Sequence, residues 1–318
     1  MTTKVSNEKL LRVIDNIEKV MIGKKEVGEL CLVALLAKGH VLLEDVPGVG
    51  KTMMVRSLAK SVSATFKRIQ FTPDLLPSDV LGVSIYDPKK MEFQFRPGPI
   101  MGHIILADEI NRTSPKTQSA LLECMEESSV TVDGVSYQLK APFFVMATQN
   151  PIEYEGTYPL PEAQLDRFLL KIEMGYPTAE EEIEVLNRAQ RIPPIEQLQP
   201  VITLDELREL QEAVLEVIVD ETIKRYIVDL ATRTRTHTNV YLGVSPRGSI
   251  GLMRACQAYA LLRGRDYVIP DDVQYLAPFV FAHRMILKPE ATYEGITSRE
   301  VVQQIIQRTK IPIKKVVR

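Results

Sequence analysis

The sequence predicts an α/β fold, with a three-layer α/β/α core around a parallel sheet and an all-α helical region after it. Three observations lead to this prediction. A strand-like apolar run at residues 41–43 passes through a glycine turn into a helical pattern, and a second apolar run ends in Asp108-Glu109. Beyond Gly175 no strand pattern of similar quality occurs. We therefore expect one domain at residues 1–175 and a helical second domain at 176–318.

The turn after the first strand has the composition of a phosphate-binding loop. It reads Gly48-Val-Gly50-Lys51-Thr52 and leads directly into a helix. Glycines let successive backbone N–H groups line an anion site, and the helix adds the positive end of its dipole. Lys51 supplies a mobile positive charge and Thr52 a hydroxyl for Mg²⁺. The same string alone would also fit an ordinary turn, but the flanking strand and helix favour phosphate binding.

The start of this loop departs from the usual G-x-x-x-x-G-K-[ST] pattern, because Asp45 occupies the first glycine position. A carboxylate near phosphates is costly unless it is paired or directed away. Asp45 is therefore the residue that the pattern leaves unexplained.

The acidic pair follows four apolar residues, so the strand presents two carboxylates at its carboxyl end, the edge where parallel sheets bind ligands. Asp108 suits Mg²⁺ through water, and Glu109 can polarise a hydrolytic water. An acidic turn at a strand end is the alternative. The position of Asp108, 57 residues after Lys51, favours the functional interpretation.

Two further polar residues are ambiguous when taken alone. Asn150 follows a strand and can bond a phosphate or the attacking water, but Asn before Pro151 is also a common turn. Arg247 lies one residue inside a helix capped by Ser245, where a cation opposes the helix dipole. That suggests an anionic partner nearby, whereas an exposed arginine that tolerates the penalty is the simpler alternative.

Other local signals place the remaining elements. Ser6 is expected to cap a first helix, and Gly39 to end a second. Alternating apolar residues predict hairpins within residues 84–96 and 130–139. Capping boxes begin three helices of the second domain: Thr178 with Glu181, Thr203 with Glu206, and Thr297 with Glu300.

The composition excludes several classes of protein. Of 318 residues, 39 are Lys or Arg and 41 Asp or Glu, a net charge of −2, which gives no bulk electrostatic case for nucleic acid. No segment approaches the roughly 18 consecutive apolar residues of a membrane span, and residues 1–19 lack a secretory apolar region. The three cysteines, Cys31, Cys124 and Cys256, are widely spaced and read as buried free thiols. We expect a cytoplasmic protein without membrane insertion.

The ordered motifs resemble those of AAA+ ATPases, which have the P-loop NTPase fold, and within them the MoxR family, over nearly the whole chain. The segments that carry the resemblance are Leu-Leu-Glu-Asp-Val-Pro-Gly-Val-Gly-Lys-Thr (42–52), Ala-Asp-Glu-Ile-Asn-Arg (107–112), Ala-Thr-Gln-Asn-Pro (147–151), Leu-Pro-Glu-Ala-Gln-Leu-Asp-Arg-Phe (160–168) and Val-Ser-Pro-Arg-Gly (244–248). Their order and spacing are more specific than any one of them.

This resemblance implies a role for each candidate residue. Residues 45–52 are similar to Walker A, and Asp108 and Glu109 to Walker B. Asn150 is similar to sensor one, Arg247 to sensor two of the same chain, and Arg167 to the arginine finger that reaches a neighbouring subunit, with Arg112 as a weaker candidate for that interface. The expected nucleotide contacts are Ile22, Gly23, Pro47, Gly48, Val49, Gly50, Lys51, Thr52, Met53 and Arg247, with Thr52 and Asp108 at the metal.

By this resemblance the cofactors are ATP and Mg²⁺, and the finger in trans implies a ring, usually a hexamer. The leading hypothesis is an ATPase of the MoxR type that remodels or activates partner proteins, with a von Willebrand A domain protein as the expected client. A metal-chelatase-like motor subunit and a nucleotide-switched scaffold with negligible hydrolysis are the alternatives. A nucleic-acid motor is weaker, given the net charge.

Overall fold

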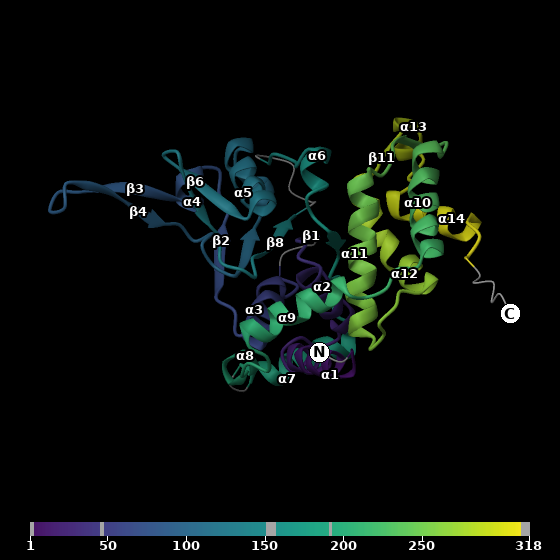
Figure 1. Ribbon diagram of the computed structural model, residues 1–318, viewed down its shortest axis with the longest axis horizontal. Helices are drawn as coiled ribbons and strands as arrows, with labels where there is room; N and C mark the ends of the chain where they lie inside the picture. The colour runs from purple at the N-terminus through teal and green to yellow at the C-terminus, as the bar shows by residue number, and fades with distance from the viewer. Residues whose placement is uncertain (1–2, 45–47, 151–156, 191–192, 313–318) are drawn as a thin grey trace.

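Five parallel strands form the central sheet of the computed structural model, which describes residues 3–44, 48–150, 157–190 and 193–312. Their order across the sheet is β2-β5-β8-β1-β9; Figure 1 labels β2, β8 and β1. The strands are β1 (Val41–Glu44), β2 (Phe66–Gln70), β5 (Ile104–Asp108), β8 (Phe144–Gln149) and β9 (Leu170–Ile172). All five residues of β5 are buried, as expected for a parallel strand covered on both faces. The edge strand β2 exposes Lys67 and Arg68, and such charges discourage pairing with another chain.

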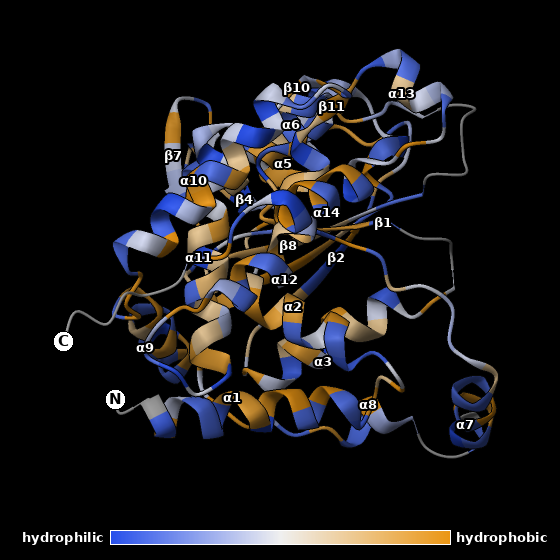
Figure 2. Cartoon of the chain, turned by 90° about the vertical axis from the view of Figure 1, so that its right-hand side faces the viewer, coloured by the Kyte–Doolittle hydropathy of each residue, from blue (hydrophilic) through white to orange (hydrophobic). Residues whose placement is uncertain are grey.

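Helices cover both faces of this sheet, so the three-layer prediction is confirmed. Leu43, Leu106 and Met146 pack into the core formed with α1 (Thr3–Glu18), α2 (Lys25–Leu36) and α3 (Lys51–Ser61). Their neighbours Leu42, Ile105 and Val145 point to the other face and pack with α5 (Pro115–Glu127). This alternation follows from the two-residue period of a strand. In Figure 2, which colours the cartoon by hydropathy, hydrophobic residues mark the strands β1 and β8 and parts of the helix α2 beside them.

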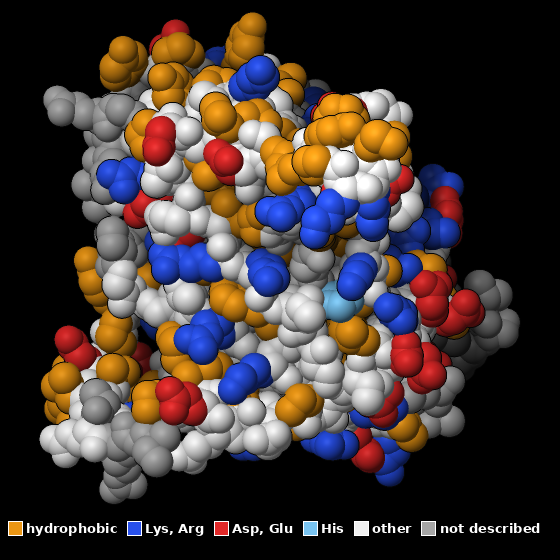
Figure 3. All heavy atoms as spheres, turned by 90° about the vertical axis from the view of Figure 1, so that its left-hand side faces the viewer, with side chains coloured by type: hydrophobic (Ala, Val, Ile, Leu, Met, Phe, Trp, Pro, Cys, Tyr) orange, Lys and Arg blue, Asp and Glu red, His pale blue; other side chains and the backbone are white. Residues whose placement is uncertain are grey.

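Both predicted hairpins are present. The longer one pairs β3 (Gly82–Asp87) with β4 (Glu92–Pro97), after the short helix α4 (Pro77–Leu81), and the second pairs β6 (Ser129–Val132) with β7 (Val135–Gln138). The long hairpin projects from the body as an arm (Figure 1). Phe95 of β4 stacks on Tyr137 of β7, with ring centroids 4.1 Å apart, so the two hairpins are joined. Met91 and Phe93 near the end of the arm are 79% and 73% exposed. Figure 3 views this side of the molecule, where Lys and Arg side chains form a band below apolar side chains.

The second half is helical, as predicted, apart from a short antiparallel pair, β10 (Val240–Leu242) and β11 (Ile286–Leu287), which the sequence did not predict. All three capping boxes form. The helices here are α7 (Ala179–Ala189), α8 (Pro194–Gln197), α9 (Leu204–Leu215), α10 (Glu221–Thr236), α11 (Pro246–Leu262), α12 (Pro270–Phe281), α13 (Pro289–Tyr293) and α14 (Ser298–Arg308), with a 3₁₀ turn at Ala282–Arg284. The short helix α6 (Glu162–Leu165) and a 3₁₀ turn at Ile110–Arg112 belong to the first half. Figure 2 shows α7 standing apart from the body.

Two local predictions were wrong. Ser6 lies inside α1 and is buried, because the helix begins earlier than the cap signal suggested. The residue in the left-handed conformation after α2 is Lys38, at φ +55°, and not Gly39. The prediction for the cysteines is confirmed, since all three are free and buried. Within the part of the chain that the structure describes, no helix is both long and apolar enough to span a membrane.

Candidate functional site

The glycine loop and the start of α3 have the geometry that the sequence predicts. Gly48 and Gly50 have φ of +89° and +94°, a conformation that side chains disfavour. Gly50 is the N-cap of α3, so Lys51 and Thr52 occupy its first turn, where backbone N–H groups are left without helical partners. Asp45 and Pro47 lie outside the described residues, so the expectations for them stay predictions.

A cavity of about 520 Å³ lies beside this loop, within the range typical of small-molecule sites. Its lining is mostly apolar and comes from four segments of the chain. The lining residues are Val20, Met21, Ile22, Lys24, Gly48, Val49, Gly50, Met53, Tyr176, Pro177, Glu182, Val185, Arg188, Pro193 and Pro194. Five residues of the predicted nucleotide set therefore line one cavity: Ile22, Gly48, Val49, Gly50 and Met53.

Two features hold the walls of this cavity. Lys24 donates hydrogen bonds from Nζ to the carbonyl oxygens of Met174, Gly175 and Tyr176, at 2.8, 3.2 and 3.2 Å, and so ties the turn before α2 to the segment before α7. Gly23 has φ +67°, and a Cβ there would collide with the side chain of Glu181. The predicted Gly23 is thus required by the turn that shapes the cavity.

At the end of β5, the carboxylate of Asp108 is enclosed by polar partners. Thr148 donates to its Oδ1 at 2.6 Å, and Arg68 donates to its Oδ2 from Nη2 at 2.6 Å and from Nε at 3.1 Å. The side chain is only 13% exposed. A positive charge is therefore already accommodated beside this oxygen, which fits a site for a cation.

Glu109 adopts φ +58°, uncommon for a residue with a side chain. Its backbone N–H donates to Thr148 Oγ1 at 2.8 Å, which links the acidic pair to β8. Its Oε2 accepts from Gln70 Nε2 at 2.7 Å and from Arg112 Nη1 at 3.0 Å. The turn after β5 thus directs the two carboxylates to different partners, as the sequence reasoning expects.

Asn150 follows β8 and is buried, and its backbone carbonyl oxygen accepts a hydrogen bond from Asn111 Nδ2 at 3.3 Å. Because β5, β8 and β1 are neighbours in a parallel sheet, Asp108, Asn150 and the glycine loop all lie at one edge of it. This brings the predicted Walker A, Walker B and sensor-one segments together.

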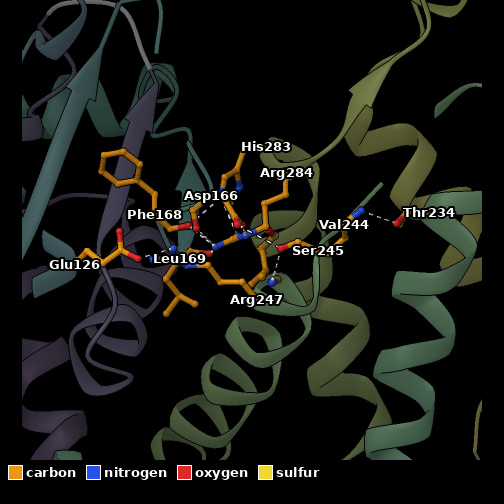
Figure 4. A network of polar contacts seen from close by, with 12 residues as sticks. Glu126, Asp166, Phe168, Leu169, Thr234, Val244, Ser245, Arg247, His283 and Arg284 are labelled. Carbon is orange, nitrogen blue, oxygen red and sulfur yellow. Dashed lines mark hydrogen bonds and ion pairs between the residues drawn. The ribbon is translucent and has the colours of Figure 1, made fainter. Parts of the chain in front are cut away.

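Arg167 and Arg247 lie at the opposite end of the sheet, where the parallel strands begin. Both contact Glu126 near the end of α5: Arg247 Nη1 is 3.0 Å from Oε1, and Arg167 Nε is 3.1 Å from Oε2 (Figure 4). The adjacent Met125 carbonyl oxygen bonds His40, the residue before β1, and His40 also accepts from the N–H of Val145 near the start of β8. Glu126 therefore lies where the strands begin.

This position bears on the expectation for Arg247. The resemblance implies that Arg247 meets the phosphate loop of its own chain, whereas that loop follows the far end of β1. Four residues of strand separate the two edges, about 13 Å. The sequence indicates an anionic partner for Arg247 without saying which one; the anion that it contacts within this chain is Glu126.

Sequence reasoning missed Arg68, Gln70, Thr148 and Glu126. The first two alternate on β2 with the buried Ile69, a pattern that puts both side chains on one face of the strand. Thr148 lies within a motif that was recognised but was given no role. Nothing local in the sequence marks Glu126, because its contacts depend on how the second half packs.

Comparison with known proteins agrees with this geometry. Residues 40–170 match the family model for ATPases associated with various cellular activities, and residues 232–305 match the AAA lid domain. The chain is 44% identical over 312 residues to Chaperone MoxR1 of Mycobacterium tuberculosis, covering 95% of this chain and 82% of that protein. The chain belongs to the MoxR family of AAA+ ATPases.

Two further proteins are similar to this chain over nearly its full length. YeaC of Bacillus subtilis is 66% identical over 304 residues, which is 96% of this chain and 95% of that protein. A crystal structure of a protein from Cytophaga hutchinsonii superposes with a TM-score of 0.92 at 41% identity and covers 98% of this chain and 97% of that one. The AAA+ fold with a parallel sheet and helical lid is thereby confirmed.

Membership in this family implies binding of a nucleotide with a divalent metal, and the residues present fit both groups. Carboxylate and hydroxyl oxygens are the ligands that Mg²⁺ prefers, and Asp108 and Thr52 supply them. The cavity beside Ile22 and Val49 offers apolar walls for a base next to a loop whose N–H groups suit phosphates.

Proposed function

We propose that this protein hydrolyses MgATP at sites shared between the subunits of a ring, and couples hydrolysis to the remodelling, maturation or activation of partner proteins. One observation carries the proposal: the loop, the acidic pair and Asn150 occupy one edge of the sheet, while Arg167 and Arg247 occupy the other. A single chain therefore has both halves of a hydrolytic site but does not bring them together.

Each residue then has a part in the reaction. Ile22, Gly23, Val49 and Met53 hold the base. The glycine loop and Lys51 bind the phosphates, and Pro47 and Asp45 belong to the same loop in sequence. Thr52 and Asp108 would hold Mg²⁺, which neutralises charge on the phosphate oxygens when bound. Glu109 polarises the attacking water and Asn150 orients it or the γ-phosphate.

The two arginines are proposed to act on the nucleotide of the adjacent subunit. Arginines that stabilise charge on the transferring phosphate contribute about 10³–10⁵ in rate in related hydrolases. Arg167 was expected in this role, and its contact with the same carboxylate as Arg247 supports giving both residues to the neighbour. Arg112 pairs with Glu109 of its own chain, which supports its lower rank as an interface arginine.

The wider setting is part of the same proposal. The ring is expected to be a hexamer in the cytoplasm, with a von Willebrand A domain protein as client. Residues 1–175 would form the nucleotide-binding domain and 176–318 the lid domain. The MoxR1 relative, which is named a chaperone, supports a protein client.

Turnover and nucleotide binding of three proteins test the hydrolytic assignment. Glu109→Gln is expected to bind ATP with unchanged affinity and to lose turnover, and Arg167→Ala to bind ATP and also to lose turnover. Glu127→Gln, a change of the same type at an exposed position of α5, serves as the control and should behave like the original protein. Full turnover in Glu109→Gln would refute the assignment.

Mixing the two inactive variants tests the shared site. Glu109→Gln subunits retain intact arginines, and Arg167→Ala subunits retain an intact loop and acidic pair. Mixed rings should therefore regain part of the turnover. A protein that stays monomeric by mass measurement with ATP, yet turns over fully, would contradict the ring.

A further inference from the structure

One carboxylate connects the two arginines. Glu126 receives Arg247 on Oε1 and Arg167 on Oε2, at 3.0 and 3.1 Å. Arg167 follows α6 in the first half of the chain, and Arg247 begins α11 in the second. The three side chains are 28–47% exposed, so all of them reach the surface.

A second carboxylate fixes the backbone behind them. Asp166, the neighbour of Arg167, accepts from Arg284 Nε at 2.7 Å on Oδ1 and from Ser245 Oγ at 3.3 Å on Oδ2. Ser245 is the N-cap of the helix that carries Arg247. Figure 4 shows Asp166 between Arg284 and Ser245, with Glu126 directed toward Arg247.

Arg284 anchors this arrangement from inside. Its side chain is 4% exposed, and it donates to the carbonyl oxygens of Phe168 at 2.6 Å and Leu169 at 3.1 Å, and to that of Val280. The segment that holds Arg167 is therefore bound to this buried guanidinium, and the helix that holds Arg247 is linked to the same segment through the bond from Ser245 to Asp166. A shift of either arginine's backbone relative to the other would strain this bond.

The negative charge of Glu126 affects the two arginines beyond its packing against them. Two guanidinium groups facing the same surface repel each other, and one shared carboxylate offsets that repulsion while fixing the distance between them. An anionic triphosphate approaching this surface meets two positive charges at a fixed spacing, which makes it a preformed receptor.

We propose that Glu126 is a positioning residue that presents Arg167 and Arg247 as one unit to the triphosphate of the neighbouring subunit. It contacts the arginines and not the nucleotide, and it acts on the site of another chain. This inference rests on the proposed function, because it assumes that both arginines serve the neighbour.

The test is Glu126→Gln, which keeps the size of the side chain but turns one oxygen into a donor that faces an arginine. We expect kcat to fall about ten- to a hundredfold with ATP affinity of the isolated subunit unchanged. Glu127→Gln is the matched control and should be unaffected. Urea unfolding of both variants checks that the fold is retained. An unchanged kcat in folded Glu126→Gln would overturn the inference.

Mixing decides whether the effect acts between chains. Rings that combine Glu126→Gln with Glu109→Gln should regain turnover, because each Glu126→Gln loop then meets intact arginines. A structural defect within the Glu126→Gln subunit would not be rescued, and absence of rescue would refute the inference. If Arg167→Ala itself kept full turnover, the proposed shared-site function would be refuted. If Arg167→Ala lost turnover while Glu126→Gln kept full turnover, only the role of Glu126 would be refuted.

Discussion

Arg68 and Asp108 form an ion pair across neighbouring strands, with Nη2 of the arginine 2.6 Å from Oδ2 of the carboxylate. Arg68 is 48% exposed on its side chain and Asp108 only 13%, so the arginine can leave toward solvent while the carboxylate stays in place. The oxygen that a magnesium ion or its water would approach is thus already occupied by a positive group.

Replacing Arg68 should therefore make the site easier to load. We expect Arg68→Ala to reach half-maximal binding of a fluorescent ATP analogue at a Mg²⁺ concentration lower by roughly two- to fivefold, since a partly exposed pair contributes about 1 kcal/mol or less and 1.4 kcal/mol is a factor of ten. Lys67→Ala, on the same strand, is the control. A higher Mg²⁺ requirement in Arg68→Ala would show instead that Arg68 assists binding.

Gly50→Ala should weaken nucleotide binding selectively. The residue has φ +94°, and a Cβ there would lie 3.2 Å from Met21 Cε in the wall of the base cavity. The strain of about 1–2 kcal/mol would shift the loop, and calorimetric titration with MgATP should show affinity reduced by roughly tenfold. Gly134→Ala, at φ +79° in the open turn of the β6–β7 hairpin, carries similar strain but should leave the affinity unchanged.

Stability should fall between pH 6.5 and pH 4 because of His40. Burial lowers the pKa of His40 to about 4, so the unfolded chain takes up a proton in this range while the folded chain does not. His40 stabilises the fold above its unfolded pKa and loses that contribution as the pH falls. Between pH 7.5 and pH 5 it accounts for about 2 kcal/mol of unfolding free energy.

The variant that tests this is His40→Gln, measured by urea unfolding at both pH values. It should be less stable than the original protein at pH 7.5, yet lose about 2 kcal/mol less on going to pH 5. His283, whose pKa burial also lowers, remains in both proteins and contributes equally. Parallel pH profiles for the two proteins would contradict the assignment to His40.

Asp272 should be important for the stability of the helical half. It is 2% exposed, pairs with Arg265 through both oxygens at 2.6 and 2.8 Å, and accepts the N–H of Ile269 at 2.9 Å. Asp272→Asn leaves a partly buried guanidinium without its counter-charge, at a cost of about 3 kcal/mol in urea unfolding. Asp205→Asn, at the exposed pair with Arg208, should cost less than about 1 kcal/mol.

Much of the fold follows from local signals in the sequence. The cap Ser245 and the boxes begun by Thr178 and Thr203 all form as predicted, because a cap is decided by residues three or four apart. The glycine loop and the end of β5 are equally local. The predicted start of α1 was wrong because the sequence signal at Ser6 is that of a cap, whereas the helix begins three residues earlier, at Thr3.

The rest of the site depends on contacts between distant segments. Gln70 reaches Glu109 because β2 pairs with β5 in a register that sets Gln70 opposite Asp108, and no residue near Gln70 in the sequence fixes that register. Arg247 was predicted to have an anionic partner, and it has one. The identity of that partner depends on how α11 lies against the end of α5.

The stack of Phe95 on Tyr137 has a mechanical consequence. A short segment, residues 98–103, joins the β3–β4 hairpin to β5, which ends at Asp108, and residues 139–143 join the β6–β7 hairpin to β8, which Asn150 follows. Each hairpin is thus connected to the start of a core strand, and a residue of the proposed hydrolytic centre lies at the other end of that strand. The stack of Phe95 on Tyr137 holds the two hairpins together. A displacement of the outer arm would therefore reach both strands through this stack, and with them the residues at the proposed hydrolytic centre.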